Sequence, residues 1–100
     1  MKLYEIAHCR AGDKGNTSIL SLIAYRADDY PLLVEKVTVA AVQRHFTGIV
    51  AGKVTRYEVP GLLALQLLCE EALLTGVTTS LAMDTHGKAL SSALLEMEIS

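Results

Sequence analysis

The segment that decides the fold is residues 3–25, which read LYEIAHCRAGDKGNTSILSLIAY. Residues 3–9 and 18–25 are rich in apolar side chains and contain no glycine or proline, so they predict two β-strands that are largely covered on both faces. Between them, residues 10–16 contain two glycines, an aspartate and an asparagine. Turns use these residue types for positive φ angles and local hydrogen bonds. The pattern therefore predicts two strands joined by a hairpin-like connection at residues 10–16.

Two short helices are predicted next. Asp28 or Asp29 precedes Pro31, which is typical of a helix start, because aspartate caps free N–H groups and proline fits the first turn. This helix is expected to end near residue 36. Thr38 is placed to cap a second helix, which continues to about residue 46. Its apolar stripe is formed by Val39, Val42 and Phe46.

The second half of the chain predicts further elements of both kinds. Residues 54–59 predict a strand, residues 62–75 a mostly apolar helix, and residues 77–84 a strand with strict alternation of apolar and polar side chains. Residues 88–99 predict a short helix with a strand-like end. Together the elements predict an α+β sandwich: a small, mainly antiparallel sheet with helices packed on one face. A ferredoxin-like or split βαβ arrangement is the natural candidate.

Composition narrows the class of protein. The 100 residues are 51% hydrophobic and carry a net charge of -2, which suits one domain over residues 1–100 with a single core. Disorder needs fewer apolar residues and more charge, and nucleic-acid binding needs concentrated Lys and Arg, so both are excluded. No apolar run reaches the about 20 residues that cross a membrane, and residues 1–6 lack the pattern of a signal peptide. We expect a cytoplasmic protein with no membrane or nucleic-acid partner.

The connection at residues 10–16 is the candidate ligand-binding site. Its glycines let backbone N–H groups turn toward one point, and its two cations outnumber its one carboxylate, so a carboxylate or phosphate anion can dock there. The proposed ligand-binding residues are Arg10, Gly12, Asp13, Lys14, Gly15 and Asn16. The spacing fits neither a P-loop nor a dinucleotide fingerprint, so no cofactor is predicted. Alternatively the segment is only a turn, in which Asp13 caps the turn, Arg10 pairs with a carboxylate and Asn16 is left-handed.

Histidines and cysteines offer weaker candidates. His8, next to the charged connection, is the best single candidate for general acid–base catalysis; otherwise it is a partly buried residue hydrogen-bonded to the backbone. His45 is expected at the edge of the core and His86 in a turn. No spacing supports a metal site. Cys9 and Cys69 form no CxxC pair, so both are expected as reduced thiols, with some thiolate character at Cys9 beside Arg10 and an inert thiol at Cys69.

Two arginines and a pair of glutamates complete the candidates. Arg44 and Arg56 can each grip a carboxylate of a ligand or a partner through bidentate contacts, although single surface arginines more often contribute nothing measurable. Glu70 and Glu71 are expected to lie on a solvated edge. No nucleophile elbow is present.

Seven segments of the chain together resemble the C-terminal domain of the acyclic terpene utilisation (AtuA-like) family. The matching segments are residues 3–8, 10–17, 30–33, 45–46, 56–60, 87–90 and 94–99, with RxGDKGN as the most specific. The resemblance implies a ferredoxin-like fold and a role in the breakdown of branched, terpene-derived acids carried as coenzyme A thioesters. In the family this domain usually follows a much larger one, so a separately encoded large partner is expected. Gly61 and Gln66 stand where the family pattern places Asn, and Cys9 where a small residue is more usual.

Three functions remain open at this point. The first is a small accessory subunit that docks on a large AtuA-type partner and places residues 10–16 at a shared active site, in a lyase or hydratase step on a branched hydroxy acid or its thioester. The second is a homo-oligomeric module that captures a small anion without chemistry. The third is a structural assembly domain in which residues 10–16 are only a turn. No complete catalytic set is present, so we expect no catalysis by the chain alone.

Overall fold

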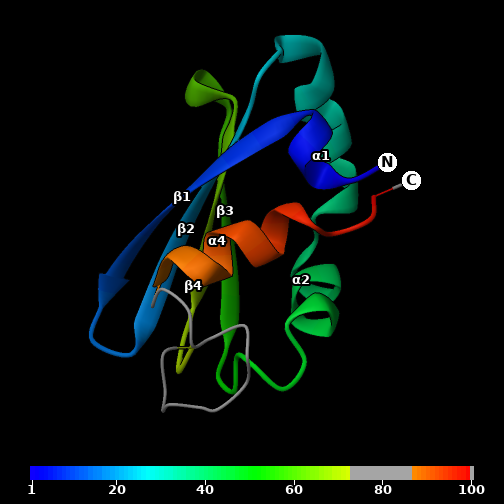
Figure 1. Ribbon diagram of the computed structural model, residues 1–100. Helices are drawn as coiled ribbons and strands as arrows, with labels where there is room; N and C mark the ends of the chain where they lie inside the picture. The colour runs from blue at the N-terminus through cyan, green and yellow to red at the C-terminus, as the bar shows by residue number, and fades with distance from the viewer. Residues whose placement is uncertain (73–86, 100) are drawn as a thin grey trace.

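The computed structural model describes residues 1–72 and 87–99, and its sheet has four strands in the order β1-β2-β4-β3 (Figure 1). All three strand pairs are antiparallel. The elements in chain order are η1 (Leu3–Glu5), β1 (Ala7–Lys14), β2 (Thr17–Ala24), η2 (Ala27–Asp29), α1 (Tyr30–Lys36), α2 (Val39–His45), β3 (Val54–Val59), η3 (Pro60–Leu62), β4 (Ala64–Cys69) and α4 (Gly87–Leu95). Within the described residues the fold therefore consists of two hairpins, each followed by helix.

The first hairpin is longer, and its turn is shorter, than the sequence predicts. β1 and β2 pair continuously from Ala7 opposite Ala24 to Lys14 opposite Thr17. Only residues 15 and 16 form the turn, and Gly15 has φ 63°, the positive angle that a type II′ hairpin turn reserves for glycine at its first position. The predicted hairpin is confirmed, but residues 10–14 are strand rather than loop. Asn16 is not the left-handed residue.

The start of the chain corrects the predicted strand over residues 3–9. Residues 3–5 form the 3-10 helix η1 instead, and the strand begins only at Ala7. Leu3 is fully buried, and its N–H donates to the carbonyl of Met97 at 2.9 Å. Lys2 and Glu98 form an isolated β-bridge, which brings the two ends of the chain side by side (Figure 1). The N-terminal apolar side chains thus pack against the C-terminal segment.

The second hairpin contains the largest error of the sequence prediction. β3 has the predicted bounds, but residues 64–69, expected within a helix over 62–75, form strand β4. The connection is the 3-10 turn η3 followed by Leu63, which has φ 56°. β4 lies between β2 and β3, so it is hydrogen-bonded along both edges and surrounded by other strands. All residues of β4 except Gln66 are apolar, so this central strand resembles a buried helix in sequence.

Helices α1, α2 and α4 lie where the sequence predicts helices. α1 carries Pro31 in its first turn, although neither Asp28 nor Asp29 caps it with a side chain. The Thr38 side chain caps α2 by accepting from the N–H of Ala41 at 3.1 Å. α4 confirms the C-terminal helix, whereas the strand predicted over residues 77–84 lies outside the described residues. In the described ranges, no helix has the length and apolarity that crossing a membrane requires.

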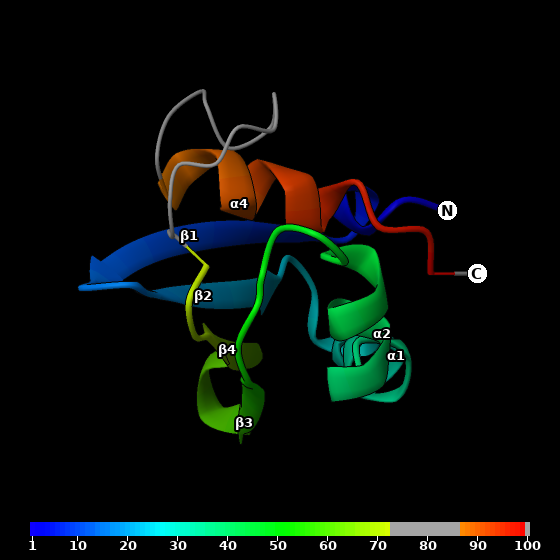
Figure 2. The ribbon, with the colours of Figure 1, turned by 90° about the horizontal axis from the view of Figure 1, so that it is seen from below.

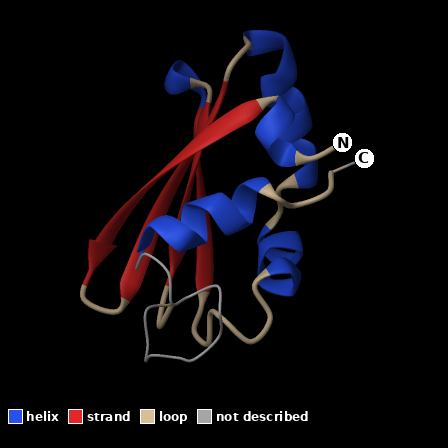
Figure 3. Cartoon of the chain, in the orientation of Figure 1, coloured by secondary structure: helices blue, strands red, loops and turns tan. Residues whose placement is uncertain are grey.

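Helices α1, α2 and α4, the α-helices of the described residues, lie on one side of the sheet (Figures 2 and 3). α4 packs over β1 and β2, while α1 and α2 lie beside β3 and β4. The core fills the space between the layers. Its fully buried large side chains include Leu3, Leu20, Leu22, Leu33, Val42, Phe46, Leu65, Leu67 and Leu94. This arrangement confirms the predicted α+β, ferredoxin-like fold class.

Gly52 lies where two backbone segments come close together. Its N–H donates to the carbonyl of Glu70 at 3.0 Å, and a Cβ at this position would meet that same oxygen at 2.7 Å. We expect Gly52→Ala to lower the free energy of unfolding by about 1–3 kcal/mol, because the backbone has to shift. Urea denaturation measures the change. Gly61→Ala is the matched control, since an added Cβ meets nothing within 4 Å there. Equal stability of the two variants would contradict the prediction.

Candidate functional site

One face of the sheet is not covered by the described helices. Along β2, buried residues alternate with half-buried ones, and the buried set Ser18, Leu20, Leu22 and Ala24 faces the core. Successive side chains of a strand point to opposite faces, so Thr17, Ile19, Ser21 and Ile23 face away from the helices. We call this the open face. The pairing registers assign residues of the other three strands to it.

The open face carries the two cations of the RxGDKGN segment. Asp13 is instead paired with Ser18 and belongs to the other face, so the register does not support the prediction that it binds a ligand together with these cations. Arg10 is paired with Ser21, and Lys14 with Thr17, so both cations belong to the open face. Both are exposed, and neither has an ion-pair partner among the side chains that the structure describes. Four residues of strand separate their Cα atoms by about 13 Å. Long side chains at this spacing can converge on one anion or bind two anionic groups of a larger ligand.

Gly12 lies between the two cations and has no role in the fold that the structure reveals. Its φ is not positive, so the backbone there suits any residue. An added Cβ at Gly12 would meet no atom within 4 Å, so close packing does not require glycine either. Glycine in a strand often marks a place where a ligand or another backbone approaches closely. Gly15, in contrast, is explained by the positive φ of the turn.

A row of polar side chains crosses the open face from Arg10. Arg10 pairs with Ser21, Ser21 with Gln66, and Gln66 with Tyr57, so one residue comes from each strand. Tyr57 is 52% exposed although it is large and aromatic. Sequence reasoning missed this row because it placed Gln66 in a helix. The alternation of Thr55, Tyr57 and Val59 in β3 is the signal that identifies the exposed tyrosine.

His8 also belongs to the open face, at the end of β1 opposite the turn. It is paired with Ile23, and its ring stacks on Tyr25 with a centroid distance of 5.2 Å and an interplanar angle of 22°. No hydrogen bond to this ring is made by any described residue, so the predicted bond to the connection's backbone is not found. Tyr25 is 61% exposed. His8 is therefore reachable from solvent and close to Arg10, two residues along the same face.

Of the other candidates, Arg56 is bound within its own chain. It faces the helices, where its guanidinium donates to the carbonyls of Val34 and Val37 at 2.8 and 2.9 Å. It also pairs with Glu58 at 2.9 Å. Arg56 thus holds β3 against the C-terminal end of α1, and the hypothesis that it grips a ligand or a partner is wrong. Its side chain is only 18% exposed.

His45 has a structural contact as well. Its Nε2 lies 2.6 Å from the carbonyl oxygen of Ala93, and since a carbonyl only accepts, Nε2 is the donor. The bond joins α2 to α4 at the edge of the core, where the sequence places His45. Arg44 is exposed on α2 and makes no ion pair with the described side chains. His86 lies outside the described residues.

Neither thiol is activated. Burial raises the pKa of Cys9 to about 12, with a smaller contribution from Cys69, so the thiolate character expected from the neighbouring Arg10 is absent. Burial also raises the pKa of Cys69 to about 11, in line with the predicted inert thiol. Both cysteines are free. Among the described residues, no three His, Cys, Asp or Glu side chains gather closely enough to hold a metal ion.

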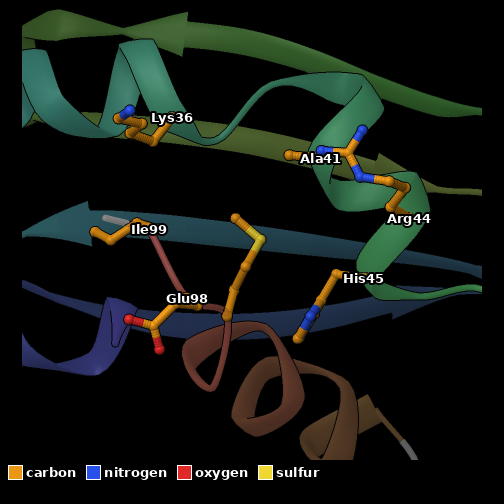
Figure 4. A pocket seen from close by; sticks show the side chains of 7 residues that line it. Lys36, Ala41, Arg44, His45, Glu98 and Ile99 are labelled. Carbon is orange, nitrogen blue, oxygen red and sulfur yellow. The ribbon is translucent and has the colours of Figure 1, made fainter. Parts of the chain in front are cut away.

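A groove of about 520 Å³ lies on the other side of the sheet, between the α1–α2 pair and the C-terminal segment (Figure 4). It is lined by Lys36, Ala41, Arg44, His45, Met97, Glu98 and Ile99. Sequence reasoning did not predict it, because its residues come from three segments that only the fold brings together. It shares no residue with the open face.

The class of protein is now defined. In the part of the chain that the structure describes, it is an α+β domain with a four-stranded antiparallel sheet, helices on one face, and the cations of β1 on the other face. The sequence matches the AtuA ferredoxin-like domain over residues 1–100, and the chain belongs to this family. Comparison with curated proteins and with solved structures found no match. The resemblance inferred from the sequence is thereby confirmed.

Proposed function

We propose that this chain is a small accessory subunit of an AtuA-type enzyme that degrades branched hydroxy acids or their coenzyme A thioesters. In this proposal the open face of β1 binds an anionic group, and a separately encoded large subunit supplies most of the active site. Membership of the AtuA ferredoxin-like domain family supports the assignment. The chain contributes binding through Arg10 and Lys14 rather than a catalytic set of its own.

The main support for the proposal is the presence of a glycine at position 12. It stands between two exposed cations, on a strand where neither φ nor packing calls for glycine. A side chain at this position would occupy the space above the strand between Arg10 and Lys14. The absence of a side chain leaves the backbone open to a carboxylate or phosphate, which the flanking guanidinium and ammonium groups bind through charge-assisted hydrogen bonds.

His8 is the candidate proton donor or acceptor within this site. Its imidazole belongs to the same face as Arg10, two residues away, so a ligand held by Arg10 lies within its reach. An imidazole can donate or accept a proton, which suits a lyase or hydratase step. Stacking on Tyr25 fixes the orientation of the ring. The reaction itself takes place in the composite site with the large partner.

The test is co-purification of the tagged chain from its native host, followed by assay of the complex with branched hydroxyacyl thioesters. We expect a large AtuA-type chain to co-purify. Arg10→Ala, Lys14→Ala and Gly12→Val should each retain that chain but lower turnover by about tenfold or more, since each removes or blocks an anion contact. Gly12→Val is the sharpest variant because it keeps both charges and suits a strand.

Matched controls separate the site from general charge effects. Arg26→Ala and Lys53→Ala each remove one exposed cation elsewhere and should leave turnover unchanged. If the controls lower turnover as much as Arg10→Ala and Lys14→Ala do, the anion-binding site is wrong. If no large chain co-purifies, the accessory-subunit proposal fails.

Self-association is the second candidate, and the sheet gives a specific reason for it. β1 and β3 each pair with only one strand among the described residues, so each has one free edge on which a second copy can add its own strand. The open face also carries Ile19, Ile23 and Leu68. Sedimentation of the purified chain distinguishes the two functions, because a defined homo-oligomer without a large partner favours a self-associating, anion-binding or structural assembly module.

A further inference from the structure

The groove beside α2 has an excess of positive charge on one rim. Lys36 lies at the end of α1 and Arg44 on α2, and both are exposed. Neither makes an ion pair with any side chain in the described ranges. His45, the third basic residue of the lining, is occupied by the carbonyl of Ala93. The rim therefore presents two free cations to whatever enters the groove.

Among the described residues, Glu98 is the only carboxylate of the lining, and it does not neutralise this rim. Glu98 bonds to the amino group of Met1 and lies 3.9 Å from the ammonium of Lys2. The hydrogen bond to that amino group is the largest cause that lowers the pKa of Glu98. In Figure 4 the carboxylate of Glu98 points away from Arg44. An anion in the groove is thus attracted by Lys36 and Arg44, and no carboxylate of the described lining residues competes with it at that rim.

The rest of the lining is apolar. Met97 and Ile99 are core residues, 5% and 4% exposed, so the apolar wall that they form opposite the half-buried Ala41 is only the outer edge of the core. Methionine adapts its flexible side chain to irregular ligand shapes. The volume of about 520 Å³ lies within the range of about 300–1,000 Å³ that is typical of small-molecule sites. Two cations next to an apolar surface match a ligand with an anionic head and a hydrocarbon tail.

We infer that this groove binds a small amphipathic carboxylate, with its carboxylate between Lys36 and Arg44 and its hydrocarbon chain against Ala41, Met97 and Ile99. Arginine binds carboxylates in bidentate geometry, and lysine adds a second charge. The apolar wall favours a carboxylate with a chain over a bare inorganic anion, which would leave that surface in contact with water. This site is separate from the open face and does not depend on the proposed function.

The test is an NMR titration of the isotope-labelled chain with octanoate. We expect amide shifts to concentrate at residues 36, 41, 44 and 97–99, with saturation at millimolar concentrations, about 1–10 mM. Two ligand controls accompany it: octanol has a similar chain without the charge, and acetate has the charge without the chain. Both should bind at least about tenfold more weakly.

Variants of the lining residues test which side chains bind the carboxylate of octanoate and whether its hydrocarbon chain occupies the groove. Lys36→Gln and Arg44→Gln should each weaken octanoate binding by about tenfold, while octanol binding stays the same. Lys53→Gln and Arg26→Gln are matched controls at exposed positions outside the groove and should not change the affinity. Ala41→Phe should abolish binding by filling the groove.

Several results would overturn the inference. Equal binding of octanol and octanoate would show that the cations do not recognise the carboxylate, and equal binding of acetate would show that the apolar wall contributes nothing. Shifts centred on β1 instead of residues 36, 41, 44 and 97–99 would place the ligand on the open face. Absence of saturable shifts with octanoate would exclude the site.

Discussion

Replacement of Arg56 by methionine should lower the free energy of unfolding by about 2–4 kcal/mol. The side chain makes two hydrogen bonds to carbonyls at the end of α1, from Val34 and Val37, and an ion pair with Glu58. These carbonyls belong to the end of a helix, where the last C=O groups lack partners within the helix and attract positive charge. Hydrogen bonds from a charged donor contribute about 1.5–3 kcal/mol each, and water replaces part of them at this partly exposed position.

Urea denaturation followed by circular dichroism measures this change. Methionine retains much of the apolar stem of arginine, so the experiment removes the guanidinium with little loss of packing. Arg56→Lys should recover only part of the loss, because an ammonium group does not reproduce the planar fork that bonds two carbonyls and a carboxylate. Arg26→Met is the control: its side chain is 72% exposed, and its ion pair with Asp28 is long, at 3.9 Å. If the Arg56→Met variant is as stable as the Arg26→Met variant, the structural role assigned to Arg56 is wrong.

Local signals predict the parts of this fold that local interactions determine. Thr38 was identified as a helix cap, and its side chain accepts from the N–H of Ala41. The strand over residues 54–59 has its predicted bounds. The hairpin was predicted from its turn residues, but not its register. The length of β1 depends on pairing with β2 up to Lys14, and this pairing leaves only a two-residue turn.

Tertiary contacts decide the parts that the sequence does not predict. The sequence predicts a strand over residues 3–9, but residues 3–5 form a 3-10 helix, in which Leu3 is fully buried and its N–H donates to the carbonyl of Met97. The role of Arg56 depends on the position of α1, which no local pattern contains. In the sequence, nothing distinguishes Arg56, which faces the helices, from an arginine on the exposed face of a strand.

The sequence predicts several residues of the candidate site but not how they are arranged in space. The sequence predicts Arg10, Gly12 and Lys14 in a hairpin-like connection whose glycines turn backbone N–H groups toward one point, where an anion can dock. Their positions in β1 place them along one face of a strand, and the alternation of the strand adds His8 to the same face. The two glycines consequently have different explanations: Gly15 forms the turn, whereas Gly12 leaves the strand accessible. This distinction requires the backbone angles, which the sequence does not contain.

Strand β4 is the element that the sequence predicts least well. Replacing Leu67 or Leu68 by alanine tests it, because the same chemical change is made at two neighbouring positions. In a helix, Leu68 would lie beside Leu65 on one face, three residues along. In β4, Leu67 instead shares the core face with Leu65, and Leu68 turns to the open face. Leu67 is fully buried, and Leu68 is half-buried. We expect Leu67→Ala to lower the free energy of unfolding by about 3–4 kcal/mol, because it leaves a cavity in a packed core.

Leu68→Ala should cost less than about 1.5 kcal/mol, because its side chain is already partly in contact with water and no cavity forms. Both variants delete the same atoms at neighbouring positions, so differences in helix or strand propensity cancel. Urea denaturation of the pair gives the comparison directly. If Leu68→Ala lowers the free energy of unfolding more than Leu67→Ala does, the assignment of the two faces of β4 is wrong. The open face would then lose its assignment, since the facing of His8, Arg10, Gly12 and Lys14 depends on the registers of β1, β2 and β4 together.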